Sequence, residues 1–126
     1  MIKFNNIKIE KLHLIEHLPQ VGSKKIGYKF VNGIFILESN FNEPIDYIIN
    51  NEGEFLIGTG HYKLNKKKET LYSAGRIIVD KKITYIDNDS GHYNPSFEHT
   101  QEIASFLKKN GFTSDEIEII DVGNLP

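Results

Sequence analysis

Short runs in which apolar and polar residues alternate dominate most of the chain, as expected for β-strands with one buried face. Residues 26–31 and 34–39 form two such runs around Asn32-Gly33, a pair that favours a type I′ turn because both positions need a positive φ. The sequence therefore predicts a hairpin here. Two further strand pairs are predicted where apolar runs flank a polar turn, at 45–49 with 54–58 and at 71–79 with 83–87.

The N-terminal segment has a more ambiguous pattern. Ile7 and Ile9 alternate with polar residues and predict a strand over 6–10. The apolar residues over 11–18 fit either a strand or a short helix that ends at Pro19, and both interpretations stay open.

The periodicity changes to that of an amphipathic helix near residue 97. Ser96 is a candidate N-cap and Asn110-Gly111 is a C-terminal stop signal, so the helix is expected over about 97–109. A final short strand is predicted at about 117–122. We therefore expect an α+β fold, in which a mainly antiparallel β-sheet or partial barrel packs against one C-terminal helix.

Composition and charge narrow the classes of function. The length of 126 residues suits a single domain with its own core. Because the chain has no cysteine, disulfides, thiolate metal sites and thiol nucleophiles are excluded. A net charge of −2 argues against binding of duplex nucleic acid through charge alone. No run is apolar and long enough to cross a membrane, and the first residues contain no signal-peptide core.

A repeated tripeptide is the most distinctive feature: Gly60-His61-Tyr62 and Gly91-His92-Tyr93, both at expected loops or strand ends. Histidine titrates near neutral pH, so His61 and His92 are candidate catalytic residues that could face one cleft as general acid and base. The alternative is structural, with each His or Tyr tip bonded to a backbone group that it holds in place. If the functional interpretation is right, His92→Ala abolishes ligand binding while the fold still melts cooperatively.

Further candidate binding residues surround the two Gly-His-Tyr motifs. The second motif lies just before the predicted helix, where free backbone N–H groups favour an anion. Tyrosine rings can stack on a base or a sugar, and the single arginine of the chain, Arg76, is a candidate anion contact. The predicted ligand-binding residues are Tyr62, Arg76, Ser90, Gly91, Tyr93, Asn94 and Ser96.

No metal site and no cofactor is predicted. His13 and His17 lie four positions apart on one face, but a third ligand is missing nearby, although Glu10 or Glu16 could contribute. Residues 87–98 lack the glycine that an EF-hand calcium loop needs at its sixth position. The chain also lacks a Gly-x-Ser-x-Gly nucleophile elbow and a complete Gly-rich phosphate loop.

The segment Ser90-Gly91-His92-Tyr93-Asn94-Pro95 follows a predicted strand with Ala74-Gly75 and precedes Ser96 and the helix. This order resembles a domain of plant and fungal calmodulin-binding proteins of the IQ-motif type, outside their IQ helix, and of bacterial proteins linked to secreted polymorphic toxins. The family often has a histidine-rich strand before the Ala-Gly segment, and only His61 matches it here. Because the chain has no IQ helix, calmodulin binding is not implied.

Three hypotheses about function follow. The first is a small soluble bacterial domain related to polymorphic-toxin modules, which binds a ligand or partner at a cleft formed by the two motifs. The second is an enzyme acting on a nucleotide-like or sugar-phosphate ligand, with ADP-ribosyl transfer as one chemistry and a histidine as acid or base. The third is an immunity or adaptor protein that works by protein contact. The expected location is cytoplasmic, or exported as a toxin module without a signal peptide.

Overall fold

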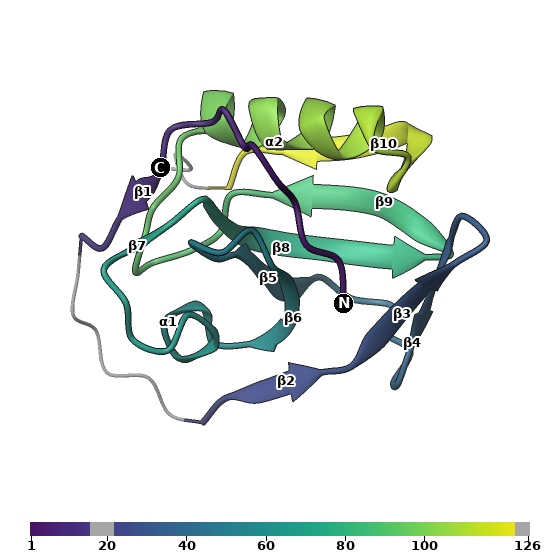
Figure 1. Ribbon diagram of the computed structural model, residues 1–126, viewed down its shortest axis with the longest axis horizontal. Helices are drawn as coiled ribbons and strands as arrows, with labels where there is room; N and C mark the ends of the chain where they lie inside the picture. Colours follow the sequence, from purple (N-terminus) through teal and green to yellow (C-terminus); the bar gives the residue numbers. More distant parts are fainter. Residues whose placement is uncertain (16–21, 123–126) are drawn as a thin grey trace.

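The structure is a computed structural model that describes residues 1–15 and 22–122. Its elements, in chain order, are β1 (Leu12–His13), β2 (Lys24–Ile26), β3 (Tyr28–Val31), β4 (Ile34–Leu37), β5 (Ile45–Ile49), β6 (Phe55–Thr59), α1 (His61–Leu64), β7 (Thr70–Leu71), β8 (Ser73–Asp80), β9 (Lys82–Asp87), α2 (Phe97–Lys109) and β10 (Thr113–Ile120). They form a central six-stranded sheet with a two-stranded sheet near each end in the view of Figure 1. No helix of the described residues is long and apolar enough to span a membrane.

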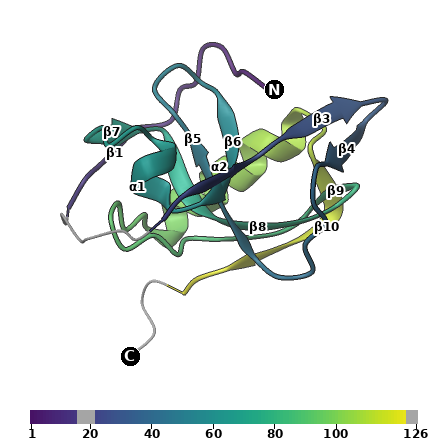
Figure 2. The same ribbon diagram turned by 90° about the horizontal axis from the view of Figure 1, so that it is seen from below.

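The central sheet has the strand order β10-β9-β8-β5-β6-β2. Neighbouring strands are antiparallel except for β10, which runs parallel to β9. A parallel pair needs a crossover connection, and α2 provides it on one face of the sheet (Figure 2). The sheet is open, so the fold is α+β with a mainly antiparallel sheet and is not a closed barrel.

Successive side chains along the strands point to opposite faces of the sheet, and each face has its own core. The larger core packs against α2 and includes Tyr47, Phe55 and Leu107. The smaller core includes Ile48 on the other face of β5 and Leu64 of α1. The two Gly-His-Tyr motifs belong to this second face, because Tyr62 and Tyr93 pack in or against the smaller core.

The first predicted hairpin is confirmed, although its strands are shorter than expected. β3 pairs with β4, and Asn32 and Gly33 have φ of 54° and 79°, as a type I′ turn requires. Ile26 belongs instead to β2, which pairs with β6 at the edge of the central sheet. The other two predicted strand pairs are also present, as β5 with β6 and β8 with β9.

The predicted strand over 6–10 is wrong. Ile7 and Ile9 do pack against the larger core, which accounts for the alternating pattern. Residues 6–10 nevertheless do not form a strand. The backbone turns at Asn6, which has a φ of 56°, and the segment does not run along a partner strand. Within the ambiguous segment 11–18, β1 pairs with β7, and the part from residue 16 onward lies outside the described residues.

The predicted helix over 97–109 is confirmed as α2, and the Ser96 hydroxyl accepts a hydrogen bond of 3.0 Å from the His99 N–H. The final strand is longer than predicted, because β10 already begins at Thr113. Asp115 and Glu116 in its first half are exposed, as an edge strand allows. Because these residues are polar, the first half of β10 shows no alternation of apolar and polar positions that would predict a strand.

Candidate functional site

The first Gly-His-Tyr motif lies at the end of β6, as expected, but it begins the short helix α1. The N–H of Gly60 donates to Oδ2 of Asp46 at 2.8 Å. The His61 ring is buried, with Nε2 2.6 Å from the Gly75 carbonyl oxygen and 3.7 Å from Oδ1 of Asp46. Since a carbonyl oxygen can only accept a hydrogen bond, Nε2 of His61 carries the hydrogen. This hydrogen bond connects α1 to β8.

The Ala74-Gly75 segment of β8, whose Gly75 carbonyl bonds to His61, is needed for close packing. A Cβ at Gly75 would lie 2.1 Å from the Asp87 carbonyl oxygen and 3.1 Å from the Tyr47 ring. No side chain fits there, so glycine allows the backbone of β9 and the Tyr47 ring to approach closely. Ala74 is fully buried in the smaller core.

The second motif lies in the turn before α2, and its tyrosine is structural. Tyr93 is 2% exposed, and its hydroxyl donates to the Lys68 carbonyl at 2.8 Å and accepts from Nδ2 of Asn65 at 3.0 Å. Burial raises the pKa of Tyr93. The side chain thus holds the segment that follows α1 against the turn before α2.

The other predicted binding residues of this turn mainly shape the backbone. Ser90 is buried, and its hydroxyl has no hydrogen-bond partner among the described residues. Asn94 has a positive φ of 43°, and its N–H donates to the Ser90 carbonyl at 2.6 Å. Gly91 and Ser96 are exposed, and Ser96 is the N-cap of α2. These contacts fix the turn that carries His92.

The two motifs meet at a stacked pair of rings, which we call the Tyr–His stack. The centroids of the Tyr62 and His92 rings lie 5.2 Å apart, and the ring planes are 8° from parallel. Both side chains are partly exposed. The structure therefore brings the motifs together, but the rings of the two histidines contact different groups. His61 bonds to the Gly75 carbonyl, while His92 stacks on Tyr62.

Arg76 lies in a row of charged residues across the second face, between Asp46 of β5 and Asp87 of β9. Its guanidinium is 2.8 Å from Oδ2 of Asp87 and 3.3 Å from Oδ2 of Asp89. Tyr85 also donates to Oδ2 of Asp87, at 2.7 Å. Burial alone would lower the pKa of Arg76, but the hydrogen bond and charge of Asp87 outweigh it and raise this pKa. The predicted anion contact is thus already paired with two carboxylates.

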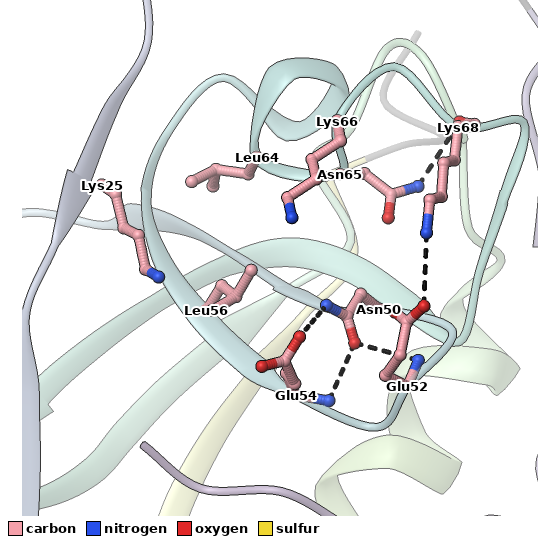
Figure 3. A pocket seen from close by; sticks show the side chains of 9 residues that line it. All are labelled: Lys25, Asn50, Glu52, Glu54, Leu56, Leu64, Asn65, Lys66 and Lys68. Atoms are coloured by element: carbon pink, nitrogen blue, oxygen red, sulfur yellow. Dashed lines mark hydrogen bonds and ion pairs between the residues drawn. The ribbon is translucent and has the colours of Figure 1, made fainter.

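A pocket of about 320 Å³ lies at the C-terminal end of α1, next to the turn between β5 and β6 (Figure 3). We call it the lysine pocket; it is lined by Lys25, Asn50, Glu52, Glu54, Leu56, Leu64, Asn65, Lys66 and Lys68. Sequence reasoning misses it because its walls come from segments that are distant along the chain. The lysine run at 66–68 is the local signal that points to it.

Metal binding finds no support in the part of the chain that the structure describes. Among residues 1–15 and 22–122, no group of three or more His, Asp or Glu side chains is placed to hold a metal ion. His13 is exposed in β1, and His17, its predicted companion, lies outside the described residues.

No family model, curated protein or solved structure matches this chain. The resemblance to toxin-associated and IQ-motif proteins therefore stays a prediction. Any assignment of function depends on the geometry of the Tyr–His stack and the lysine pocket.

Proposed function

We propose that this chain is a small ligand-binding module that contacts its ligand at the Tyr–His stack. The observation that carries the proposal is the stack itself, two partly exposed rings from separate motifs that lie nearly parallel. In this proposal the exposed part of the two rings, with their polar atoms, is the contact surface. The planar base of a ligand can stack on it, and the C–H groups of a sugar ring can pack against it.

Hydrogen bonds of two buried side chains support the stack from both sides. His61, the neighbour of Tyr62, is bonded to β8, and Tyr93, the neighbour of His92, is bonded to the segment after α1. Rings that are oriented before binding lose less conformational entropy when a ligand arrives. In this proposal His61 and Tyr93 form the framework, and Tyr62 and His92 form the contact surface.

The enzymatic alternative has less support from the geometry. The Nε2 hydrogen of His61 is directed at the Gly75 carbonyl, so this buried nitrogen is not free to exchange a proton with a substrate. Arg76 is bound to Asp87 and Asp89 and would have to leave them to hold an anion. We therefore propose binding rather than catalysis.

The test is an NMR titration of the labelled chain with adenosine 5′-monophosphate and with adenosine, which both carry a planar ring. We expect saturable shifts at Tyr62 and His92, and about a tenfold loss of affinity in Tyr62→Leu, since stacking on one ring contributes about 1–3 kcal/mol. Tyr62→Phe is the matched control because it keeps the ring. His92→Ala should lose binding and still melt cooperatively. Equal affinities of Tyr62→Leu and Tyr62→Phe, or no saturable shifts, would exclude the stack as the contact surface.

The biological setting is part of the same proposal. The resemblance of residues 90–95 to bacterial toxin-associated modules supports a role in a polymorphic-toxin system. Expression in a bacterial host should then slow growth, and His92→Ala should relieve the effect. His92 is the better residue to change, because His61 is buried and its loss would also weaken the fold. Harmless expression of the unaltered chain would count against a toxin.

A second candidate function, protein contact as an immunity or adaptor protein, is favoured by the β3–β4 hairpin. Val31, Ile34 and Ile36 are 45%, 37% and 53% exposed on one face of it. Exposed apolar clusters of this kind mark contact surfaces for other proteins. Replacing Ile34 and Ile36 with Lys should release a bound partner protein, while Ser39→Lys, an exposed control nearby, should not. Retention of the partner by both variants would exclude the hairpin.

A further inference from the structure

We infer that the lysine pocket binds a small sugar phosphate. This inference goes beyond the Tyr–His stack and does not depend on it, because the two sites share no residue. It follows from three properties of the pocket, namely the two lysines that make no ion pair among the described residues, its hydrogen-bond acceptors and its size.

Two lysine side chains enter the pocket from two different segments of the chain (Figure 3). Lys25 comes from β2 and Lys66 from the segment after α1, and both ammonium ends point inward near Leu56. Neither lysine has an ion pair within the described residues, whereas Lys68 is paired with Glu52 at 3.2 Å. The pKa of Glu52 is lowered mainly by its hydrogen bond from Lys68 and, to a smaller extent, by the charge of Lys66. Lys25 and Lys66 make no ion pair of their own among the described residues, so both ammonium groups suit a phosphate, which carries about two negative charges near neutral pH.

Hydrogen-bond acceptors also line the pocket. Asn65 is 2% exposed, and its Nδ2 donates to the Thr70 carbonyl at 2.9 Å, but its Oδ1 has no donor among the described residues. In Figure 3 this oxygen points toward the interior of the pocket. Glu54, whose Oε1 accepts from Nδ2 of Asn50 at 2.9 Å, adds a carboxylate. Both groups favour a ligand that brings hydroxyl donors.

The carboxylate distinguishes a sugar phosphate from a bare phosphate ion. The lysines attract the phosphate group of either ligand and Glu54 repels it, so Glu54 favours the sugar phosphate only by accepting hydrogen bonds from its neutral hydroxyls. A sugar phosphate can place its phosphate between Lys25 and Lys66 and turn its neutral hydroxyls toward Glu54. Leu56 and Leu64 offer an apolar wall to the C–H groups of the sugar. The volume of about 320 Å³ is at the lower end of the roughly 300–1,000 Å³ range of ligand pockets, which suits a monosaccharide.

The backbone after α1 holds Lys66 in position. Lys66 and Lys67 have φ of 53° and 60°, a left-handed conformation that is unfavourable for residues with a side chain. Their N–H groups donate to the carbonyls of Lys63 and Tyr62 at 3.0 and 2.8 Å, which stabilises the turn. Both side chains are exposed, but Lys66 lines the pocket and Lys67 does not. Lys67 is therefore the matched control for Lys66.

The test is isothermal titration calorimetry of the full chain with glucose 6-phosphate, inorganic phosphate and glucose. We expect glucose 6-phosphate to bind more tightly than the other two probes. Lys25→Gln and Lys66→Gln should each weaken its binding about tenfold, as expected for the loss of one charge-assisted hydrogen bond. Lys67→Gln should leave the affinity unchanged. Thermal melts of the three variants would show that each is folded.

Four results would overturn the inference. Glucose that binds as tightly as its phosphate would show that the lysines do not recognise the phosphate, and inorganic phosphate of equal affinity would show that the sugar is not recognised. Equal losses in Lys66→Gln and Lys67→Gln would indicate general attraction by charge, and no heat with any probe would exclude the site. Binding of glucose 6-phosphate should survive in His92→Ala, which separates this inference from the proposal for the Tyr–His stack.

Discussion

At the scale of single residues, buried polar side chains decide how the segments around the candidate sites are held. The Tyr93 hydroxyl makes two hydrogen bonds and the His61 ring bonds to the Gly75 carbonyl, all within the protein. Both residues come from motifs that suggested chemistry, yet their polar atoms are used for the protein's own structure. The functional interpretation of the motifs therefore concerns Tyr62 and His92.

Removing the Tyr93 hydroxyl should destabilise the fold. Tyr93→Phe deletes the donor to the Lys68 carbonyl and the acceptor for Asn65 in a buried setting, so we expect a loss of about 1–3 kcal/mol. Urea denaturation measures this change. Tyr62→Phe is the control, because that ring is partly exposed and the change should stay within about 0.5 kcal/mol. Equal losses in the two variants would show that the Tyr93 hydrogen bonds do not stabilise the fold.

His99, in the first turn of α2, should make stability depend on pH. Burial lowers its pKa from the usual 6.5, and its Nε2 is buried without a hydrogen-bond partner among the described residues. The unfolded chain therefore takes up a proton at His99 more readily than the folded protein. This contribution to stability is complete above about pH 6.5 and is lost as the pH falls below it. Thermal melts at about pH 7.5 and about pH 5.5 should show a smaller acid-induced loss for His99→Gln than for the unaltered chain, and an identical loss would contradict this role.

At the scale of elements, local signals in the sequence predicted the structures that local contacts stabilise. The bounds of α2 follow from Ser96 and Asn110-Gly111, and the β3–β4 turn follows from Asn32-Gly33. A strand also needs a partner, and alternation does not reveal whether one is present. Residues 6–10 alternate without a partner strand, whereas the polar first half of β10 is a strand because it lies beside β9. Parallel pairing through α2 is a contact in space that no local pattern contains.

Loss of the helix cap should lower the free energy of unfolding, whereas a similar substitution inside α2 should not. Ser96→Ala removes the acceptor for the His99 N–H and should cost about 1 kcal/mol in unfolding free energy. Ser105→Ala, at an exposed position inside the same helix, should be neutral or stabilising because alanine favours helices. Urea denaturation of the two variants compares them directly. A Ser96→Ala variant as stable as Ser105→Ala would mean that the cap hydrogen bond makes no net contribution.

At the scale of the whole molecule, both candidate sites depend on contacts between distant segments. The repeated tripeptide pointed to two segments that do meet, but the sequence could not show that Tyr62 and His92 form the stack. Arg76 was predicted to contact an anion, and its carboxylate partners, Asp87 and Asp89, come from β9 and the residues just after it. The lysine pocket combines β2, the β5–β6 turn and the end of α1, so it exists only in the folded chain.

The sheet order also predicts how stability is distributed over the molecule. β5 lies between β8 and β6, and β8 lies between β5 and β9, with Ile48 and Ile77 fully buried on opposite faces. The β3–β4 hairpin is a separate two-stranded sheet that leaves Ile36 half exposed. Amides of β5 and β8 should exchange with solvent only when the whole domain unfolds, and those of the hairpin through local opening.

Native-state hydrogen exchange followed by NMR tests this distribution. We expect paired amides of the hairpin to exchange about a hundredfold or more faster than those of β5, because local openings need only part of the global unfolding free energy. The β8–β9 pair, of similar antiparallel type but within the large sheet, is the internal control. Protection of the hairpin amides equal to that of the β5 amides would contradict this prediction. It would mean that the hairpin unfolds together with the large sheet, through the packing of Phe30 and Phe35 in or against the larger core. The exposed apolar face of the hairpin would then be a rigid surface, which would strengthen the case for protein contact there.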